Sequence, residues 1–132
     1  MILVADTHAL VWWVSHSKKL SAPALRALRS AAKAGPVHVS AISIFEICTL
    51  VRRQRLELGV PVGKWLAAVR ALPEISIEPV TSEIAEAAGA LGEHMHGDPA
   101  DRIIVATARE LGAKLVSADE KIAAESGVEV IW

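Results

Sequence analysis

One carboxylate in this chain stands where carboxylates are rarely found. Glu46 is the only charged residue between Ala41 and Val51, and the apolar residues around it predict a buried helix. A carboxylate in such a helix requires either a cationic partner or a bound metal ion. The sequence leaves both interpretations open, with Arg102 as a candidate partner for a buried ion pair.

Three further acids lie at the ends of predicted elements. Asp6 follows the short apolar run over residues 2–4, and Asp119 comes shortly after the apolar pair at 115–116, so both lie at the carboxyl ends of predicted strands. Asp101 lies in the first turn of a predicted helix. It shares the inward-facing stripe of that helix with apolar residues, namely Ile104, Val105 and Ala108.

Each of these acids also has a purely structural interpretation. Asp6 is a suitable N-cap for the helix that follows it, and Asp119 suits a loop or cap position. Asp98 and Pro99 predict a helix start in which Asp101 acts as a capping-box-like acid, favoured by the helix dipole. Taken singly, capping explains Asp101 and Asp119 at least as well as chemistry does.

The four acids together favour a metal site. In open α/β sheets, ligands bind at the edge formed by the carboxyl ends of parallel strands, and the predicted positions converge there. Four neighbouring carboxylates repel one another by roughly 1 to 4 kcal/mol per close pair, so a cation must offset them. Oxygen ligands without paired His or Cys favour Mg²⁺ or Mn²⁺ over zinc. Such ions activate water and hold a phosphodiester for in-line attack.

The elements that must position these acids alternate between strand and helix. We predict a three-layer α/β/α fold with a central parallel sheet of four to five strands, formed by one domain over residues 1–132. The expected strands lie at 2–4, 37–39, 75–80, 114–116 and 128–131. The expected helices begin near residues 8, 21, 40, 65, 83, 99 and 120.

Composition excludes several classes of protein. Hydrophobic residues make up 52% and charged residues 22%, which excludes a disordered chain and a coiled coil. A net charge of −1 excludes a uniformly basic surface that coats nucleic acid. The single cysteine, Cys48, cannot form an internal disulfide and is expected to be a small buried hydrophobe. With no basic leader and no long apolar stretch, we expect a cytoplasmic protein without a membrane span.

Several segments, in their order and spacing, resemble the PIN-domain family, and more closely the VapC-type toxin ribonucleases of bacterial and archaeal toxin–antitoxin pairs. The segments that carry the resemblance are Leu3–Leu10 with Trp12-Trp13, Val39–Ser43 continuing to Glu46-Ile47, Val51–Arg53 with Arg55-Leu56, Gly97–Arg102 leading into Ile104–Ala108, and Leu115–Asp119. Together they extend over nearly the whole chain.

The resemblance implies specific roles. Asp6, Glu46 and Asp101 match the three core metal-binding acids of the family, and Asp119 matches the region of a more variable fourth acid. It further implies an endoribonuclease dependent on Mg²⁺ or Mn²⁺, a homodimer, and inhibition by a small cognate antitoxin whose tail covers the active site. Ser117 matches a position where the family commonly has Ser or Thr near the metal.

Other polar residues have weaker candidate roles. Thr7 and Ser43 are expected to orient the metal ligands, and Asp98 can assist them, although an N-cap role explains it more simply. Candidate RNA contacts are the basic residues Arg52, Arg53, Arg55 and Arg102, although the first three also suit a solvated helix end and Arg102 an acid partner. His94 and His96 are interpreted as structural, because two His in a loop without Cys are weak support for a metal site.

Two alternative functions remain open from the sequence. A receiver-like signalling domain also binds Mg²⁺ through Asp residues, but it would need an acid pair after the first strand, where Ala5 precedes Asp6. A non-catalytic PIN-like scaffold would bind RNA or protein without cutting it. Such a scaffold has no reason to keep four mutually repelling acids, so the sequence favours the nuclease.

Overall fold

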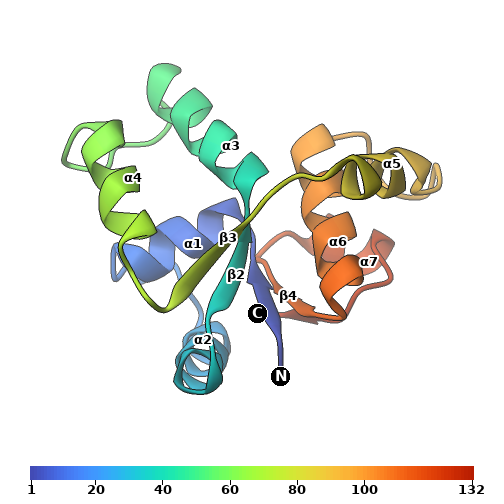
Figure 1. Ribbon diagram of the computed structural model, residues 1–132, viewed down its shortest axis with the longest axis horizontal. Helices are drawn as coiled ribbons and strands as arrows, with labels where there is room; N and C mark the ends of the chain where they lie inside the picture. The colour runs from blue at the N-terminus through green and yellow to red at the C-terminus, as the bar shows by residue number, and fades with distance from the viewer.

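Five parallel strands form the centre of the molecule, and helices cover both faces of the sheet (Figure 1). The computed structural model describes residues 1–132. Its strands are β1 (Leu3–Ala5), β2 (Val37–Ser40), β3 (Ile75–Glu78), β4 (Lys114–Val116) and β5 (Val130–Ile131). They lie in the order β3-β2-β1-β4-β5. The predicted three-layer α/β fold with a parallel sheet is therefore confirmed.

The strand order contradicts the receiver-like alternative. A receiver domain has the order 2-1-3-4-5, whereas here β4 is inserted beside β1 on the side opposite β2. Val4 of β1 is in register with His38 of β2 and with Leu115 of β4. From β1 the chain adds β2 and β3 on one side of the sheet, and β4 and β5 on the other side. The strand order therefore reverses between β1 and β4, which is the topological switch point.

Successive residues of β1 enter opposite cores, as the alternation of side chains along a strand requires. Leu3 and Ala5 belong to the larger apolar cluster, which α1 (Thr7–Val14), α2 (Ala22–Ala34) and α4 (Val62–Arg70) cover. Val4 belongs to the second cluster, under α6 (Pro99–Leu111) and α7 (Glu120–Glu125). α5 (Ser82–Ala90) packs on α6 rather than on the sheet. Both faces of the short central strand are therefore buried.

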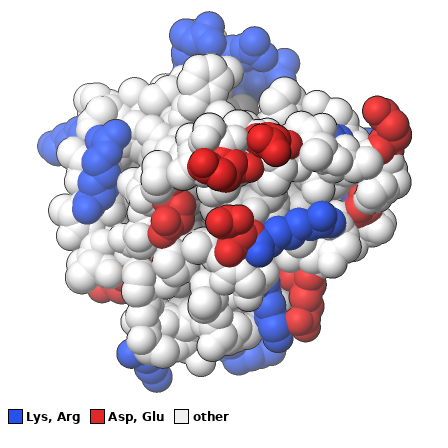
Figure 2. All heavy atoms as spheres, turned by 45° about the vertical axis from the view of Figure 1, so that its right-hand side comes forward, with Lys and Arg blue, Asp and Glu red and all other residues white.

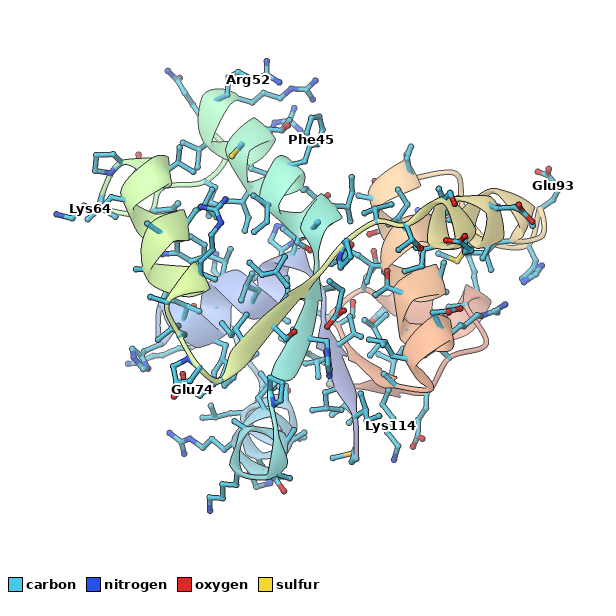
Figure 3. The ribbon with its side chains drawn as sticks, in the orientation of Figure 1. Phe45, Arg52, Lys64, Glu74, Glu93 and Lys114 are labelled. Atoms are coloured by element: carbon cyan, nitrogen blue, oxygen red, sulfur yellow. The ribbon has the colours of Figure 1, made fainter.

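α3 (Ala41–Arg52) lies at the carboxyl edge of the sheet, between the two helical layers, and contacts both α1 and α6. Its outer side is exposed: Phe45 is 68% exposed and points away from the molecule in Figure 3. Cys48 is exposed as well, so its predicted burial is wrong. The prediction failed because α3 is apolar all round, and the sequence could not show which side the sheet leaves uncovered.

Local signals account for the ends of the helices. Ser21, Ser40 and Asp98 cap α2, α3 and α6 through side-chain oxygens that accept backbone N–H groups, as predicted. α6 ends at Gly112, whose φ of +62° suits glycine and turns the chain directly into β4. No helix is long and apolar enough to cross a membrane.

Candidate metal centre

The predicted acids line one cavity of about 430 Å³. Its carboxylates come from Asp6, Glu46, Asp98, Asp101 and Asp119. Asp6 directly follows β1 and Asp119 follows β4, so the cavity lies at the carboxyl ends of these strands, at the switch point of the sheet. Figure 2 shows acidic side chains gathered on one face of the molecule.

Asp6 is held at the amino end of α1. Its Oδ1 accepts the backbone N–H of Ala9 at 2.9 Å, which makes Asp6 the N-cap of that helix. Asp6 is only 8% exposed. Burial raises the pKa of this carboxyl, and the nearby Glu46 adds to that rise, while Ser117, Ala9 and His8 oppose it. Asp6 therefore both caps α1 and lines the candidate metal site.

Glu46 is oriented by hydroxyl groups rather than by a cation. The Thr7 hydroxyl donates a hydrogen bond to Glu46 Oε1 and lies 3.0 Å from the Ser43 hydroxyl. Because the Thr7 hydroxyl carries one proton, Ser43 must supply the proton of the bond between the two hydroxyls. Both hydroxyl residues are buried. The ion pair considered for Glu46 and Arg102 is not formed, so this explanation of the acid is wrong.

Asp101 is paired with a histidine that the sequence interpretation had left aside. His96 Nε2 lies 2.8 Å from Asp101 Oδ2, and His96 Nδ1 lies 2.9 Å from Glu125 Oε1. Burial raises the pKa of Asp101 to about 6, although the His96 hydrogen bond opposes the rise. The bonds from Asp101 and Glu125 raise the pKa of His96 in turn. His96 thus links the metal-site acid to α7.

Asp119 is the N-cap of α7, where its Oδ1 accepts the N–H of Lys121 at 2.8 Å. Ser117, which is buried, accepts the N–H of Asp119 at 3.1 Å, and it lies close enough to Asp6 to lower the pKa of that carboxyl. Potential ligand atoms of His96, Asp101 and Asp119 all lie within 4.8 Å of one another. Asp6 and Glu46 lie outside this group but border the same cavity.

The acids of the cavity repel one another. The charge of Glu46 raises the pKa of Asp6, and the charges of Asp98 and Asp119 raise the pKa of Asp101. No Lys or Arg lines the cavity. A divalent cation is the group that would offset this negative charge, and carboxylate oxygens are the donors that Mg²⁺ and Mn²⁺ prefer. The donor set fits such an ion.

The candidate RNA-contact residues lie away from the cavity. Arg52, Arg53 and Arg55 are at and beyond the carboxyl end of α3 and exposed, and Figure 3 shows Arg52 there. Arg102 instead donates to the backbone carbonyls of Ala88, Met95 and Leu91. Its guanidinium thereby ties the end of α5 and the loop after it to α6, and its contact with RNA stays a prediction.

Sequence reasoning missed two contributions to the site. The absence of Cys from its loop favours a structural His96, but its position five residues before Asp101 is the signal that the loop can fold back onto this acid. His8 and Trp12 also line the cavity, one helical turn apart on α1. Their spacing of four residues, beginning two residues after Asp6, is the available signal.

Comparison with protein families gives a match to the PIN domain over residues 3–126. Among curated proteins, the chain is 35% identical over 120 residues to "Ribonuclease VapC22" of Mycobacterium tuberculosis, a match that covers 91% of this chain and 88% of the relative.

Solved structures share the fold at lower identity. VapBC2 of Rickettsia felis, solved with a DNA fragment from its promoter, matches with a TM-score of 0.71 at 17% identity, over 98% of this chain and 97% of that one. VapC20 of Mycobacterium tuberculosis, described as a toxin that cleaves the sarcin-ricin loop, matches with a TM-score of 0.70 at 22% identity, over 96% and 95%. A toxin–antitoxin complex of Klebsiella pneumoniae matches with a TM-score of 0.63 at 20% identity, over 92% and 90%.

Proposed function

The chain belongs to the PIN-domain family, as a VapC-type ribonuclease, and from this premise we propose how its site works. It is an endoribonuclease that hydrolyses RNA phosphodiester bonds with Mg²⁺ or Mn²⁺, and it serves as the toxin of a toxin–antitoxin pair. One observation carries the proposal: the acids that follow β1 and β4 meet the acids of α3 and α6 in a single cavity that contains no Lys or Arg.

The residues that would hold the metal are Asp6, Glu46, Asp101 and Asp119, with Asp98 beside them. When bound, the ion supplies an activated water and neutralises charge on the phosphodiester during in-line attack.

The surrounding residues keep the acids in position. The Thr7 hydroxyl holds Glu46 Oε1 and is itself positioned by the Ser43 hydroxyl, and Ser117 accepts the N–H of Asp119 beside Asp6. His96 holds Asp101 Oδ2. Such partners fix the direction in which each carboxylate oxygen points, and their loss typically lowers metal affinity or activity by about 10- to 100-fold.

The positively charged residues that would bind the RNA backbone lie outside the cavity. Arg52 lies six residues beyond Glu46 on α3, which is about 9 Å along the helix axis. Arg52, Arg53 and Arg55 are exposed there and are suited to bind phosphates that flank the scissile bond. Because net charge is −1, phosphate binding relies on this local cluster rather than on the whole surface.

The proposal includes two protein partners. Solved structures with the same fold include toxin–antitoxin complexes, which supports a cognate antitoxin for this chain. We also propose that the chain forms a homodimer. Co-expression with the protein encoded beside it, followed by size-exclusion chromatography with light scattering, measures both assemblies directly.

Cleavage of a total RNA pool tests the activity. Wild-type protein with Mg²⁺ or Mn²⁺ should cut RNA, EDTA should stop the cutting, and Glu46→Gln should be inactive under all conditions while remaining folded. Glu110 is an exposed acid of α6 that lies outside the cavity, so Glu110→Gln serves as the matched acid-to-amide control. Metal-independent cutting, or full activity of Glu46→Gln, would refute the proposed site.

A further inference from the structure

An aromatic strip borders the acids. The rings of His8 and Trp12 have centroids 5.5 Å apart, and those of Trp12 and Trp132 are 5.7 Å apart. His8 and Trp12 also line the cavity that holds the acids. The strip therefore begins in the metal site and runs from α1 to the residue after β5.

The composition of the cavity leaves substrate binding unexplained. RNA is polyanionic, yet the lining contains five carboxylates and no Lys or Arg. The carboxylates of the cavity therefore repel the phosphates of the RNA until a cation is bound. Stacking of bases on aromatic rings does not depend on net charge and contributes to the binding of any base, because every base has a π face. The aromatic strip is the part of the lining suited to that role.

The placement of the strip matches a nucleotide next to the reacting phosphate. α1 begins at its N-cap Asp6, and His8 and Trp12 follow on one face of the helix, about 6 Å apart along its axis. His8 is exposed and Trp12 is partly exposed, so both rings are accessible from the cavity. Trp132 contacts Trp12 at a ring-centroid distance of 5.7 Å and is itself 37% exposed.

We propose that His8, Trp12 and Trp132 form a nucleobase-stacking subsite that binds single-stranded RNA beside the position of cleavage. This inference rests on the proposed ribonuclease function and adds to it the residues that bind the base next to the reacting phosphate. Bases within a duplex are stacked on each other and hide their faces, so the subsite requires an unpaired nucleotide. Trp12, at the centre of the strip, contributes most.

Trp13 provides a matched control on the same helix. It lines a separate, mostly apolar cavity with Val14 and Leu72 and does not line the cavity of the acids. Both Trp12 and Trp13 are partly buried and pack against the main apolar core, so replacement by Leu removes the same side-chain volume at either position. A difference between Trp12→Leu and Trp13→Leu in RNA binding therefore reports on position rather than on stability.

The test measures binding and cleavage of short single-stranded oligoribonucleotides. We expect Trp12→Leu to weaken binding by about 5- to 150-fold and to raise KM more than it lowers kcat. Trp12→Phe should retain most of the binding, and Trp13→Leu should resemble wild type. The loss in Trp12→Leu should be the same at low and high salt, because stacking releases no counterions.

A second probe avoids substitution altogether. An abasic ribose-phosphate oligomer of the same length keeps the charge but lacks the bases, and wild-type protein should bind it more weakly than the homopolymers of A, C, G or U. Equal binding of both probes, or unchanged kinetics in Trp12→Leu while wild type cuts RNA, would overturn the stacking subsite and leave the ribonuclease intact. A wild-type protein that neither cuts nor binds RNA would instead remove the proposed function itself.

Discussion

His96 Nε2 lies 2.8 Å from Asp101 Oδ2, while the opposite ring nitrogen lies 2.9 Å from Glu125 Oε1. The backbone N–H of His96 also donates to Glu125 Oε1, at 2.8 Å. The imidazole is therefore fixed from both sides, and Glu125 lies on α7, the helix that Asp119 caps. His96 thus connects the proposed ligand Asp101 to α7, the helix whose N-cap is the proposed ligand Asp119.

Removal of this histidine should weaken the metal centre. In His96→Gln, Asp101 loses its partner, and we expect the affinity for Mn²⁺ to fall by about 10- to 100-fold, measured by calorimetry. His94→Gln, in the same loop but exposed, is the control. Wild-type affinity in His96→Gln would show that the bond to Asp101 does not support the site.

Metal binding should depend on pH through Asp101. Burial raises the pKa of its carboxyl to about 6 in the metal-free protein, so protons compete with the ion below that pH. The affinity for Mn²⁺ should be nearly constant above pH 7 and fall by up to about tenfold per pH unit below 6. Calorimetry in two buffers of different ionisation enthalpy should detect proton release near pH 6. A flat affinity between pH 7 and 5 would contradict this assignment.

Neutralising Asp6 should stabilise the metal-free fold. Asp6→Asn keeps a good N-cap but removes a buried charge that Glu46 repels, a gain on the order of 1 kcal/mol. Because the pKa of Asp6 is raised in the folded state, its protonated form favours folding at low pH, and this stability is lost as pH rises. The gain in Asp6→Asn should therefore be largest at pH 7 to 8 and vanish well below the ordinary value of 3.8. Thermal unfolding in EDTA at several pH values measures it, and a loss of stability at pH 7 would oppose the prediction.

The Thr7 hydroxyl should matter for activity more than for stability. Thr7→Val keeps the shape but removes the donor to Glu46, and we expect cleavage to fall by about 10- to 100-fold, whereas Thr7→Ser should stay active. Thr107 is a matched control, because its buried hydroxyl donates to the Ile103 carbonyl within α6, at 2.8 Å. If Thr107→Val reduced cleavage as much as Thr7→Val, loss of any buried hydroxyl would explain the effect, and the specific role of Thr7 at Glu46 would be contradicted.

Arg102 should stabilise the folded protein. Its guanidinium donates to carbonyls of the segment between α5 and α6, and Arg102→Ala leaves these groups without their partner. We expect a loss of about 1.5 to 3 kcal/mol in the free energy of unfolding, measured with urea, with little change in RNA affinity of the folded protein. Weaker RNA binding at unchanged stability would contradict this prediction and support a contact between Arg102 and RNA.

The sequence by itself determined the elements and the acids. Apolar runs predicted the strands, residues such as Ser40 and Asp98 marked helix starts, and the acids after β1 and β4 pointed to one edge of a parallel sheet. These features depend on neighbours within a few positions along the chain, because capping and hydrophobic periodicity act over one or two turns.

Only the tertiary structure decided how the acids are held. Thr7 and Glu46 are 39 positions apart and His96 and Glu125 are 29 apart, so neither contact leaves a local pattern. Insertion of β4 beside β1 brings Ser117 and Asp119 to Asp6, and the packing of α3 at the sheet edge decides that Cys48 faces outward. Such contacts follow from which surfaces are buried together, a property of the whole fold rather than of any one segment.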